Sequence, residues 1–598
     1  MSRTLSRSFA LAKPSCLPLL EACTKAAHLR QIHALLITKG LSEDKGTSNT
    51  ILHLCHKLLR SHSRFKEPST MLSLYKQLLQ CGASPNGVTF SLVLKACSDL
   101  KALDLVMGIH AQSLSLGFHS DALVLNSLIH AYIACGSLEF AHEVFDELPD
   151  RDRIAWTELI NGYVRDGCAK EAIGLFFCMM ETSVRPDEVS IVAICNACSQ
   201  LGELSLGRLI EGLACKIGVE DNTHVVNSLI DMYSKCGSID DSWRLFDGLM
   251  EKDVVSWNSM VAGLTRTGDM EAARRLFDQM PQKNEVSWSL LINGYVQNDC
   301  FTKALTVYNE MVDVGVAPNE AAITGTVTAC AHLGALDLGR QIHLSLNESK
   351  LCYDTVLSTA FVDMYAKCGC LDVARSLFDR IAHKNQVSWN VMIIGLAIHG
   401  KAAECLQLFA DMLKYGTMPS SMTFVGLLSA CAYAGWLEEG KNCFEKMIRI
   451  YGITPRAEHV SCMVSLLGRA GLVSEAFHLV RASSIEPDVA TWGALLSSCK
   501  VHGCVELGNF VAEKILELDP SHSGAYVQLS SMYASVNKWN KVLEIRKIMK
   551  DRGIKSRRGW SSFELDGSIH EFVVGENSHP RIREIYYALH TIDLHINA

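Results

Sequence analysis

The sequence lacks two features that would assign it to a common functional class. It contains no run of about 18 consecutive apolar residues, so we expect no membrane-spanning helix. It also lacks an excess of positive charge, because 56 lysines and arginines stand against 64 acidic residues and the formal net charge is −8. A protein that binds polyanions without selectivity normally carries a strongly basic surface. Any binding of nucleic acid by this chain must therefore depend on a local groove.

Groupings of catalytic or metal-binding residues are equally scarce. No nucleophile, metal or phosphate-loop constellation is recognisable, so we expect no enzyme activity and no cofactor. The 23 cysteines are scattered, and several recur at one position of a repeat, which favours small apolar packing residues in a reducing compartment. These recurring cysteines are Cys135, Cys236 and Cys368. One C-x-x-C pair, Cys195 and Cys198, has no second pair or nearby paired histidines, so a buried core pair is favoured over a zinc site.

The chain has an internal repeat instead. Three segments share one pattern, "NSLIHAYIACGSLEFAHEVFDEL" from Asn126, "NSLIDMYSKCGSIDDSWRLFDGL" from Asn227 and "TAFVDMYAKCGCLDVARSLFDRI" from Thr359. Repetition at about 30 to 36 residues indicates stacked helical hairpins that bury their apolar faces only against their neighbours. We therefore predict an all-α fold, a right-handed α-solenoid superhelix of helix-turn-helix repeats, with a small C-terminal hairpin-plus-helix extension.

A frame that places a recurrent polar residue at the fifth position divides residues 87–488 into units of mostly 35 or 31 residues. We expect the first helix of a unit to start near this fifth residue and to be closed by a glycine. A second helix should follow an N-cap such as Ser137. The units are 87–121, 122–152, 153–187, 188–222, 223–253, 254–284, 285–319, 320–354, 355–385, 386–420, 421–456 and 457–488.

The segments outside this array have other patterns. Residues 1–13 are basic and hydroxyl-rich, and no acid precedes Glu21, which is typical of an organellar transit peptide rather than an untidy terminal tail. Residues 14–86 look like degenerate units, and residues 489–558 look like tetratricopeptide-type hairpins without the polar slot. In residues 559–598, alternation around Asp566-Gly567 predicts a β-hairpin, and a helical pattern follows it.

The polar slots suit the recognition of nucleobases. Single-stranded RNA exposes its Watson–Crick edges, and a repeat protein can read one base per unit with two or three side chains. If the fifth and last residues of a unit act together, an ionised Asp suits the ring N–H of guanine or uracil, whereas Asn can also donate to adenine or cytosine. A short Thr or Ser at the fifth position leaves room for a purine, and the longer Asn reaches a pyrimidine. The alternative is that these residues merely cap helices.

The alternation of 35- and 31-residue units resembles the plant pentatricopeptide repeat (PPR) family, in its PLS subclass of mixed standard, long and short units. "NSLIDMYSKCGSIDDSWRLFD" and "VSWNVMIIGLAIHGKAAECLQLF" are similar to the typical text of that family, and the resemblance runs from about Leu17 to the end. It implies that the second residue of a unit sandwiches a base, as Val255, Val286 and Val387 would. The implied base-reading pairs are Asn126 with Asp152, Thr157 with Asp187, Asn227 with Asp253, Asn258 with Asn284, Ser289 with Asn319, Thr324 with Asp354, Thr359 with Asn385, Asn390 with Ser420, and Ser461 with Asp488.

A local positive charge accompanies the slots. A cation lies eight residues after the polar slot in several units, and these cations are either solvated helix surface or a row that faces phosphates. They are Arg165, Lys235, Arg266, Lys367 and Arg469.

The tail after Asp488 resembles the E and E+ extension motifs of the same family. Its last part, "RGWSSFELDGSIHEFVVGENSHPRIREIYYAL", is similar to the segment that leads into a DYW-type cytidine deaminase domain in longer relatives, although "RGWSS" departs from the usual form. A zinc deaminase needs H-x-E and a downstream C-x-x-C. None of the 22 histidines is followed two residues later by Glu, and no C-x-x-C follows Asp488. We therefore expect no deamination by this chain alone.

These patterns together favour one function and leave two alternatives. The favoured interpretation is a single-stranded-RNA-binding factor for organellar C-to-U editing, which recruits a DYW-type deaminase in trans through residues 489–598. It would act in the mitochondrion, or alternatively in the chloroplast, and without a membrane. The alternatives are a transcript processing or stability factor without editing, and a protein–protein scaffold.

Overall fold

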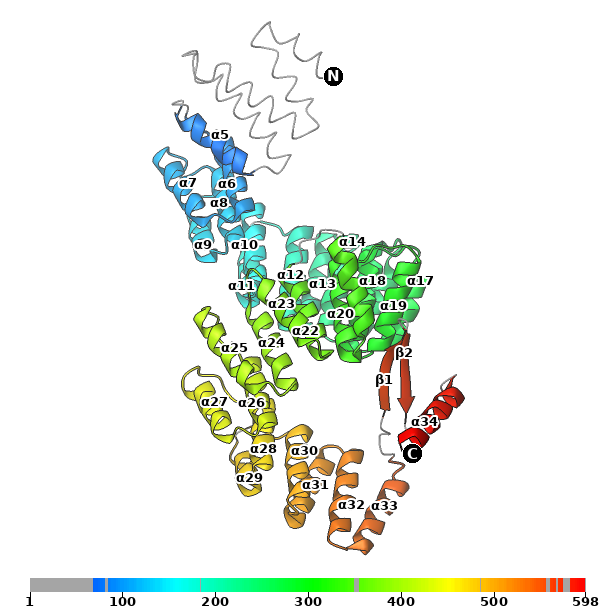
Figure 1. Ribbon diagram of the computed structural model, residues 1–598. Coiled ribbons are helices and arrows are strands. Elements are labelled where there is room, and N and C mark those ends of the chain that lie inside the picture. Colours follow the sequence, from blue (N-terminus) through cyan, green and yellow to red (C-terminus); the bar gives the residue numbers. More distant parts are fainter. Residues whose placement is uncertain are drawn as a thin grey trace, which may run out of the picture. The chain divides into compact units, whose positions relative to one another are not determined.

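In the part of the chain that the structure describes, the fold is helical almost throughout, with one β-hairpin near the C-terminus (Figure 1). The prediction of an all-α fold with a small hairpin-plus-helix extension is therefore confirmed. None of the described helices is long and apolar enough to cross a lipid bilayer. The predicted transit peptide at 1–13 and residues 14–67 lie outside the described residues. The computed structural model describes residues 68–80, 84–182, 184–348, 354–483, 485–554, 560–565, 568–573 and 581–596.

The helices form hairpins in two compact units, Met1–Met280 and Pro281–Ala598. The described helices of the first unit are α5 (Pro68–Gln80), α6 (Gly87–Leu100), α7 (Leu103–Ser115), α8 (Ala122–Ala134), α9 (Leu138–Asp146), α10 (Arg153–Arg165), α11 (Ala169–Glu181), α12 (Glu188–Leu201), α13 (Leu204–Ile217), α14 (Thr223–Lys235), α15 (Ile239–Gly248), α16 (Val254–Thr267) and α17 (Met270–Gln279). Those of the second begin with α18 (Glu285–Gln297), α19 (Phe301–Asp313), α20 (Glu320–Leu333), α21 (Leu336–Glu348), α22 (Thr355–Lys367), α23 (Leu371–Arg380), α24 (Gln386–Ile398), α25 (Ala402–Lys414), α26 (Ser421–Ala434), α27 (Leu437–Arg449), α28 (Ala457–Arg469) and α29 (Val473–Ala482).

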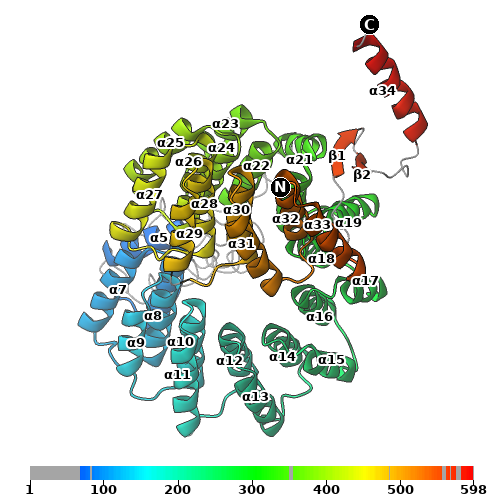
Figure 2. The ribbon, with the colours of Figure 1, turned by 90° about the horizontal axis from the view of Figure 1, so that it is seen from below.

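Successive hairpins stack within each compact unit, and the first helices of neighbouring hairpins pack against each other. In the first unit α14 contacts α12, α16 and its own second helix α15. In the second unit α24 contacts α22, α26 and its own second helix α25 in the same way. Figure 2 shows the chain as a succession of such paired helices. The stacking predicted from the repeat is thus present in both compact units.

Every first helix begins four residues earlier than the sequence pattern predicts. In the array these helices start at the first residue of the unit, as α14 does at Thr223 and α24 does at Gln386. The prediction of a start near the fifth residue is therefore wrong. The reason is that the last residue of the preceding unit is the N-cap, so the polar fifth residue already lies in the second turn.

Side-chain caps are almost universal at the first helices. From α6 to α26, and again at α30, the cap side chain accepts a hydrogen bond from a backbone N–H of the first turn. These caps are Asn86, Asp121, Asp152, Asp187, Asn222, Asp253, Asn284, Asn319, Asp354, Asn385, Ser420 and Asp488. The N-cap of α28 is Arg456, whose backbone N–H is hydrogen-bonded to Nδ1 of His459 at 2.9 Å. Ser137 occupies the predicted N-cap position of α9, but its side chain makes no capping hydrogen bond.

Close approach of neighbouring first helices depends on glycine at the tenth residue of several units. A Cβ atom added to Gly162 would lie 2.9 Å from Cδ1 of Ile133, and one added to Gly395 would lie 2.7 Å from Cβ of Ala366. Ile133 and Ala366 are both the twelfth residue of the preceding unit. A larger side chain at either glycine would push the first helices apart, and would shift the polar slots of one unit relative to the next.

Most of the described cysteines behave as packing residues. The C-cap positions of α8, α14 and α22 are Cys135, Cys236 and Cys368, all half-buried. Cys195 and Cys198 are buried on α12, and burial raises the pKa of the Cys198 thiol to about 12. Among the residues that the structure describes, no group of three or more His, Cys, Asp or Glu side chains could hold a metal ion.

After residue 488 the chain continues with two more helical hairpins and then a β-hairpin. The helices are α30 (Val489–Val501), α31 (Val505–Leu518), α32 (Ser523–Ser535) and α33 (Trp539–Asp551). Strand β1 (Trp560–Leu565) pairs antiparallel with β2 (Ser568–Val573), with Leu565 opposite Ser568. The hairpin predicted around Asp566-Gly567 is therefore confirmed, although those two turn residues lie outside the described part. The last helix is α34 (Ile582–Ile596).

Candidate nucleic-acid interface

In several repeat units, the fifth residue and the last residue of the same unit lie side by side. The fifth residue projects from the second turn of one first helix, and the last residue caps the next first helix, so helix stacking brings them together. Nδ2 of Asn126 donates to Oδ2 of Asp152 at 3.1 Å, and Nδ2 of Asn227 donates to Oδ1 of Asp253 at 3.3 Å. Nδ2 of Asn390 likewise donates to Oγ of Ser420 at 3.0 Å. Three of the nine predicted pairs are thus directly hydrogen-bonded.

A fourth pair is connected through one intervening hydroxyl. Oγ1 of Thr157 lies 2.9 Å from Oγ of Ser190, which in turn donates to Oδ1 of Asp187 at 2.8 Å. Ser190 is the third residue of the next unit and is fully buried. The hydroxyl of Thr157 is therefore linked to Asp187 only through the Ser190 hydroxyl.

In three of the remaining pairs, the fifth residue hydrogen-bonds back to its own helix. The hydroxyls of Ser289, Thr324 and Thr359 donate to backbone carbonyls three or four residues earlier, at 3.0, 2.8 and 2.6 Å. Their last residues keep the predicted cap positions, and Ser461 is half-buried on α28 while Asp488 caps α30. Asn258 belongs to the first compact unit and Asn284 to the second, so this pair is defined only by its two positions.

Capping and pairing are carried out by the same side chain. Oδ1 of Asp152 accepts from the N–H of Ala155 at 2.8 Å, while its Oδ2 accepts from Asn126. The capping interpretation is therefore correct at these residues, but it does not account for the second bond. The last residue is fixed by the helix that it caps and presents its remaining acceptor capacity beside the fifth residue.

In the pair of Asn227 and Asp253, the carboxyl group of Asp253 is negatively charged. Burial raises the pKa of the Asp253 carboxyl, but hydrogen bonds from the N–H and hydroxyl of Ser256 and from the Asn227 amide lower it more, so the pKa lies below its ordinary value. Asp253 is then ionised and accepts hydrogen bonds only. Among the described residues, the amide oxygen of Asn227 has no hydrogen-bond partner, and the same holds for Asn126 and Asn258.

The second residues of the units form a repeated set of exposed apolar side chains. Val255, Val286 and Val387 are 52%, 44% and 59% exposed, as their predicted role requires. On a helix, the second and fifth residues lie on one face, about 60° apart. Five further repeat units carry an exposed apolar residue at the same second position, which the shared frame of the repeat could have revealed. These residues are Leu123, Ile154, Val189, Val356 and Met422, all exposed.

Comparison with known proteins identifies the family. Models of the PPR repeat match residues 124–152, 154–184, 224–254, 255–285, 356–385 and 422–450, a PPR repeat family model matches 283–332 and 384–433, and an E motif model matches 502–564. A pentatricopeptide repeat-containing protein of Arabidopsis thaliana, named as mitochondrial, is 40% identical over 99% of this chain and 91% of its own length. The chain belongs to the pentatricopeptide repeat family. A second Arabidopsis member, named as chloroplastic, is 36% identical over 97% of this chain and 82% of its own length.

Two solved structures of a maize pentatricopeptide repeat protein, PPR10, are also similar. The crystal structure of that protein alone has 18% sequence identity and a TM-score of 0.46, covering 90% of this chain and 78% of the other. Its complex with an 18-nt psaJ RNA element has 16% identity and a TM-score of 0.45, covering 88% and 84%.

The cations of the PPR units lie at the ends of the first helices, where carboxylates partly neutralise them. Lys235 and Arg266 both bind Asp231, at 2.6 and 2.9 Å, and Lys367 binds Asp363 at 2.8 Å. Arg165 is exposed at the end of α10. Arg469 donates to the carbonyl of Ala432 at 3.1 Å and lies 5.2 Å from the centre of the Tyr433 ring. Contact with phosphates therefore remains a prediction, and at least three of the five cations would have to share their charge with an acid.

Proposed function

We propose that this PPR protein binds one organellar RNA sequence and directs C-to-U editing at a cytidine beyond its last repeat. The observation that carries the RNA-reading part is the direct hydrogen bond between fifth and last residues, as in Asn227 and Asp253. A side chain that merely capped a helix would not need a donor-bearing partner on the preceding first helix. The exposed second residues beside these pairs would supply apolar surfaces for stacking against the faces of bases.

The chemistry of each pair sets the proposed base. The ionised Asp253 would accept the ring N–H of uracil, and Asn227 would occupy the space that a purine needs. Thr157 with Asp187 would select guanine, and Thr359 with Asn385 would select adenine, because Asn can donate to the ring nitrogen of adenine. The order of units from N- to C-terminus would follow the RNA from 5′ to 3′.

The tail supplies the second part of the proposal. The E motif match at 502–564 supports a role in editing, and residues 489–598 would recruit a DYW-type cytidine deaminase in trans. The sequence carries no H-x-E motif for a proton-shuttling glutamate, so the catalyst would come from the partner. The names of the relatives favour an organelle, and we propose the mitochondrion, with the chloroplast as the alternative.

The test is organellar transcriptome sequencing in a loss-of-function line. We expect one or a few cytidines to lose their conversion to uridine, each preceded by bases that match the order of the pairs. Restoring the full chain should restore editing, whereas a chain truncated after residue 488 should bind the same RNA without restoring it. If no edited cytidine changes but the ends or abundance of one transcript do, the protein is a processing or stability factor instead.

A further inference from the structure

Three short units share a stack of an aromatic pair and a cation at their junction with the next unit. The twenty-fourth residue is Phe, and its ring meets edge-on the Trp that is the fourth residue of the next unit. The centroid distances are 4.7 Å for Phe145 and Trp156, 5.1 Å for Phe246 and Trp257, and 5.0 Å for Phe378 and Trp389. The cation is the thirtieth residue and lies over the Phe ring, at 4.8 Å for Arg151, 5.1 Å for Lys252 and 5.2 Å for Lys384.

The last short unit, 457–488, keeps the Trp but loses both other members of the stack. Its twenty-fourth residue is Val480 and its thirtieth is Glu486, while Trp492 remains as the fourth residue of the next unit. The next aromatic neighbour, Phe510 of α31, is 6.4 Å from Trp492, farther than the Phe rings of the other stacks. A cavity of about 450 Å³ lies at this junction, lined by Val480, Arg481, Pro487, Trp492, Phe510 and Lys514 among others.

The cavity lies away from the face that carries the base-reading positions. The fourth residue of a first helix is about 130° around the helix from the direction between its second and fifth residues. Trp492 therefore faces the second-helix layer, where Val480 of α29 and Phe510 of α31 also line the cavity. An RNA strand on the second and fifth residues would not reach this cavity, which therefore suits a protein side chain.

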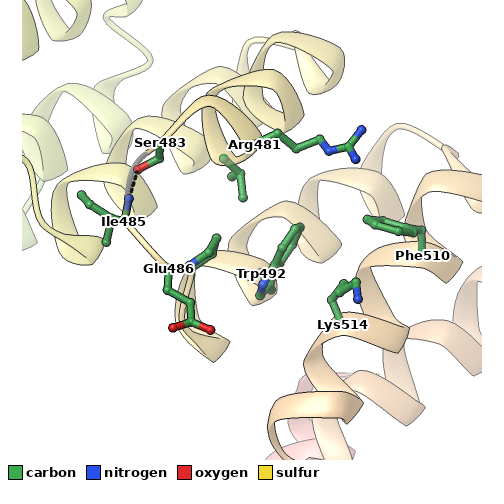
Figure 3. Close-up of a pocket in the computed structure, with 9 residues that line it drawn as sticks. Arg481, Ser483, Ile485, Glu486, Trp492, Phe510 and Lys514 are labelled. Atoms are coloured by element: carbon green, nitrogen blue, oxygen red, sulfur yellow. Dashed lines mark hydrogen bonds between the residues drawn. The ribbon is translucent and has the colours of Figure 1, made fainter.

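The rim of the cavity is cationic on the side of the second helices. Figure 3 shows Trp492, Phe510 and Lys514 around the cavity, with the Arg481 side chain above them and the Glu486 carboxylate pointing away from Lys514. Arg481 is exposed, and its guanidinium lies 5.4 Å from the centre of the Phe477 ring. Lys514 shares its charge with the exposed Glu517 at 2.6 Å. Two cations beside the Phe477 and Phe510 rings complement an aromatic group that is flanked by carboxylates.

We propose that this cavity receives an aromatic side chain, flanked by acidic residues, from a partner protein. The ring would take the place that Phe occupies in the other short units and would pack on Trp492, while its acidic neighbours would meet Arg481 and Lys514. A volume of about 450 Å³ is larger than one phenyl ring needs, so part of the flanking backbone would also enter. The inference rests on the recruitment part of the proposed function and assigns that recruitment to one junction of α29, α30 and α31.

The first test fills the cavity with a side chain of the protein itself, by a substitution at one of its lining residues. Val480→Phe introduces the residue that the other short units carry, so the chain should fold with a Tm no lower than that of the wild type. We expect RNA affinity to stay within about twofold, and editing in a complemented loss-of-function line to fall at least about tenfold. Val501→Phe, at the exposed end of α30, adds the same ring outside the cavity and should leave editing intact. Full editing with Val480→Phe would overturn the proposal.

The second test uses a defined probe and the full-length protein. The probe is a capped pentapeptide with a central Phe between two Asp residues and glycine at both ends, measured by saturation-transfer NMR and by its Kd. We expect binding that Val480→Phe removes and that Arg481→Glu with Lys514→Glu weakens at least about tenfold. Lys547→Glu with Lys550→Glu on α33 is the charge-matched control and should bind as the wild type does. The same peptide with Lys in place of Asp should bind at least about tenfold more weakly.

Other outcomes separate the parts of the proposal. If uridine monophosphate binds the cavity and the acidic peptide does not, the occupant is a nucleotide and the proposal is wrong. Absence of binding by any probe also overturns it. If the peptide binds as expected but loss of the protein changes no edited cytidine, the cavity is a docking site and the editing function is what fails.

Discussion

Nδ2 of Asn227 lies 3.3 Å from Oδ1 of Asp253, across the gap between two neighbouring first helices. Because both residues are held by helices, a base would meet a preformed donor and acceptor pair. We predict that Asn227→Thr with Asp253→Asn shifts the preference at this position from uracil to adenine. The shift should be about tenfold in relative Kd, or about 1.4 kcal/mol, measured on an RNA panel that varies one base.

The folding of this double variant should be nearly unchanged, because Asn caps a helix about as well as Asp. Asp253→Ala is the informative control, since it removes the cap and the acceptor together. It should lose about 1 kcal/mol of stability and most discrimination at this base. A double variant whose preference is still for uracil would show that this pair does not read the base.

A second prediction concerns the exposed second residues. Val387 is 59% exposed on α24, so Val387→Ser should cost little stability and should weaken RNA binding by about 1 kcal/mol or more through lost contact with a base. The weakening should be similar for every base at the affected position, because apolar stacking does not distinguish donors from acceptors. Isothermal titration with the four single-base variants of one RNA measures both quantities.

Val373 on α23 offers the matched control for Val387. It is also exposed, at 39%, but it lies on a second helix, away from the reading positions. Val373→Ser should leave RNA affinity unchanged. Equal losses in the two variants would indicate a general effect of surface polarity and would argue against a sandwiching role.

A third prediction follows from the shared acid Asp231, which holds Lys235 and Arg266 at 2.6 and 2.9 Å. If these cations face phosphates, Asp231→Asn should free them, strengthen RNA binding several-fold at low salt, and steepen the slope of log K against log salt by about 0.7 per released charge. Lys235→Ala with Arg266→Ala should have the opposite effect on both quantities. An unchanged salt slope in both variants would favour the interpretation of these cations as solvated helix surface.

Much of the architecture could be predicted from the sequence because the repeat carries its own frame. The frame placed the last residue of each unit, such as Asp152 or Asn385, at a boundary where the structure has an N-cap. The start of the first helix is not evident from the sequence, because the polar fifth residue resembles an N-cap four residues after the true start. Its true role is visible only when the neighbouring helix brings the cap beside it.

Other features needed the structure. The direct bond between Asn126 and Asp152 and the relay from Thr157 through Ser190 depend on helix stacking, which spacing alone does not give. Exposed apolar residues such as Ile154 were overlooked because an apolar residue in a helix is normally assigned to the core. The pairing of Lys235 with Asp231 could have been inferred, since the two are four residues apart on one helix.

A fourth prediction concerns pH and the Asp253 carboxyl. Hydrogen bonds from Ser256 and Asn227 outweigh burial and hold its pKa below the ordinary value of about 3.9. A carboxyl whose pKa is lowered by folding contributes stability above its unfolded pKa, and that contribution is lost as the pH falls through the folded pKa. The carboxylate should therefore remain an acceptor from pH 7.5 to pH 5.5, and the preference for uracil over adenine should change less than about twofold across that range.

The matched variant for this pH test is Asp253→Asn, which has no titratable group at the position and should also show no pH dependence. Binding is measured at both pH values with RNAs that differ only in the base assigned to this unit. A preference for uracil that weakens between pH 7.5 and pH 5.5 in the wild type, but not in Asp253→Asn, would mean that Asp253 gains a proton in this range. The cap and the acceptor would then be weaker than the hydrogen bonds of Ser256 and Asn227 imply.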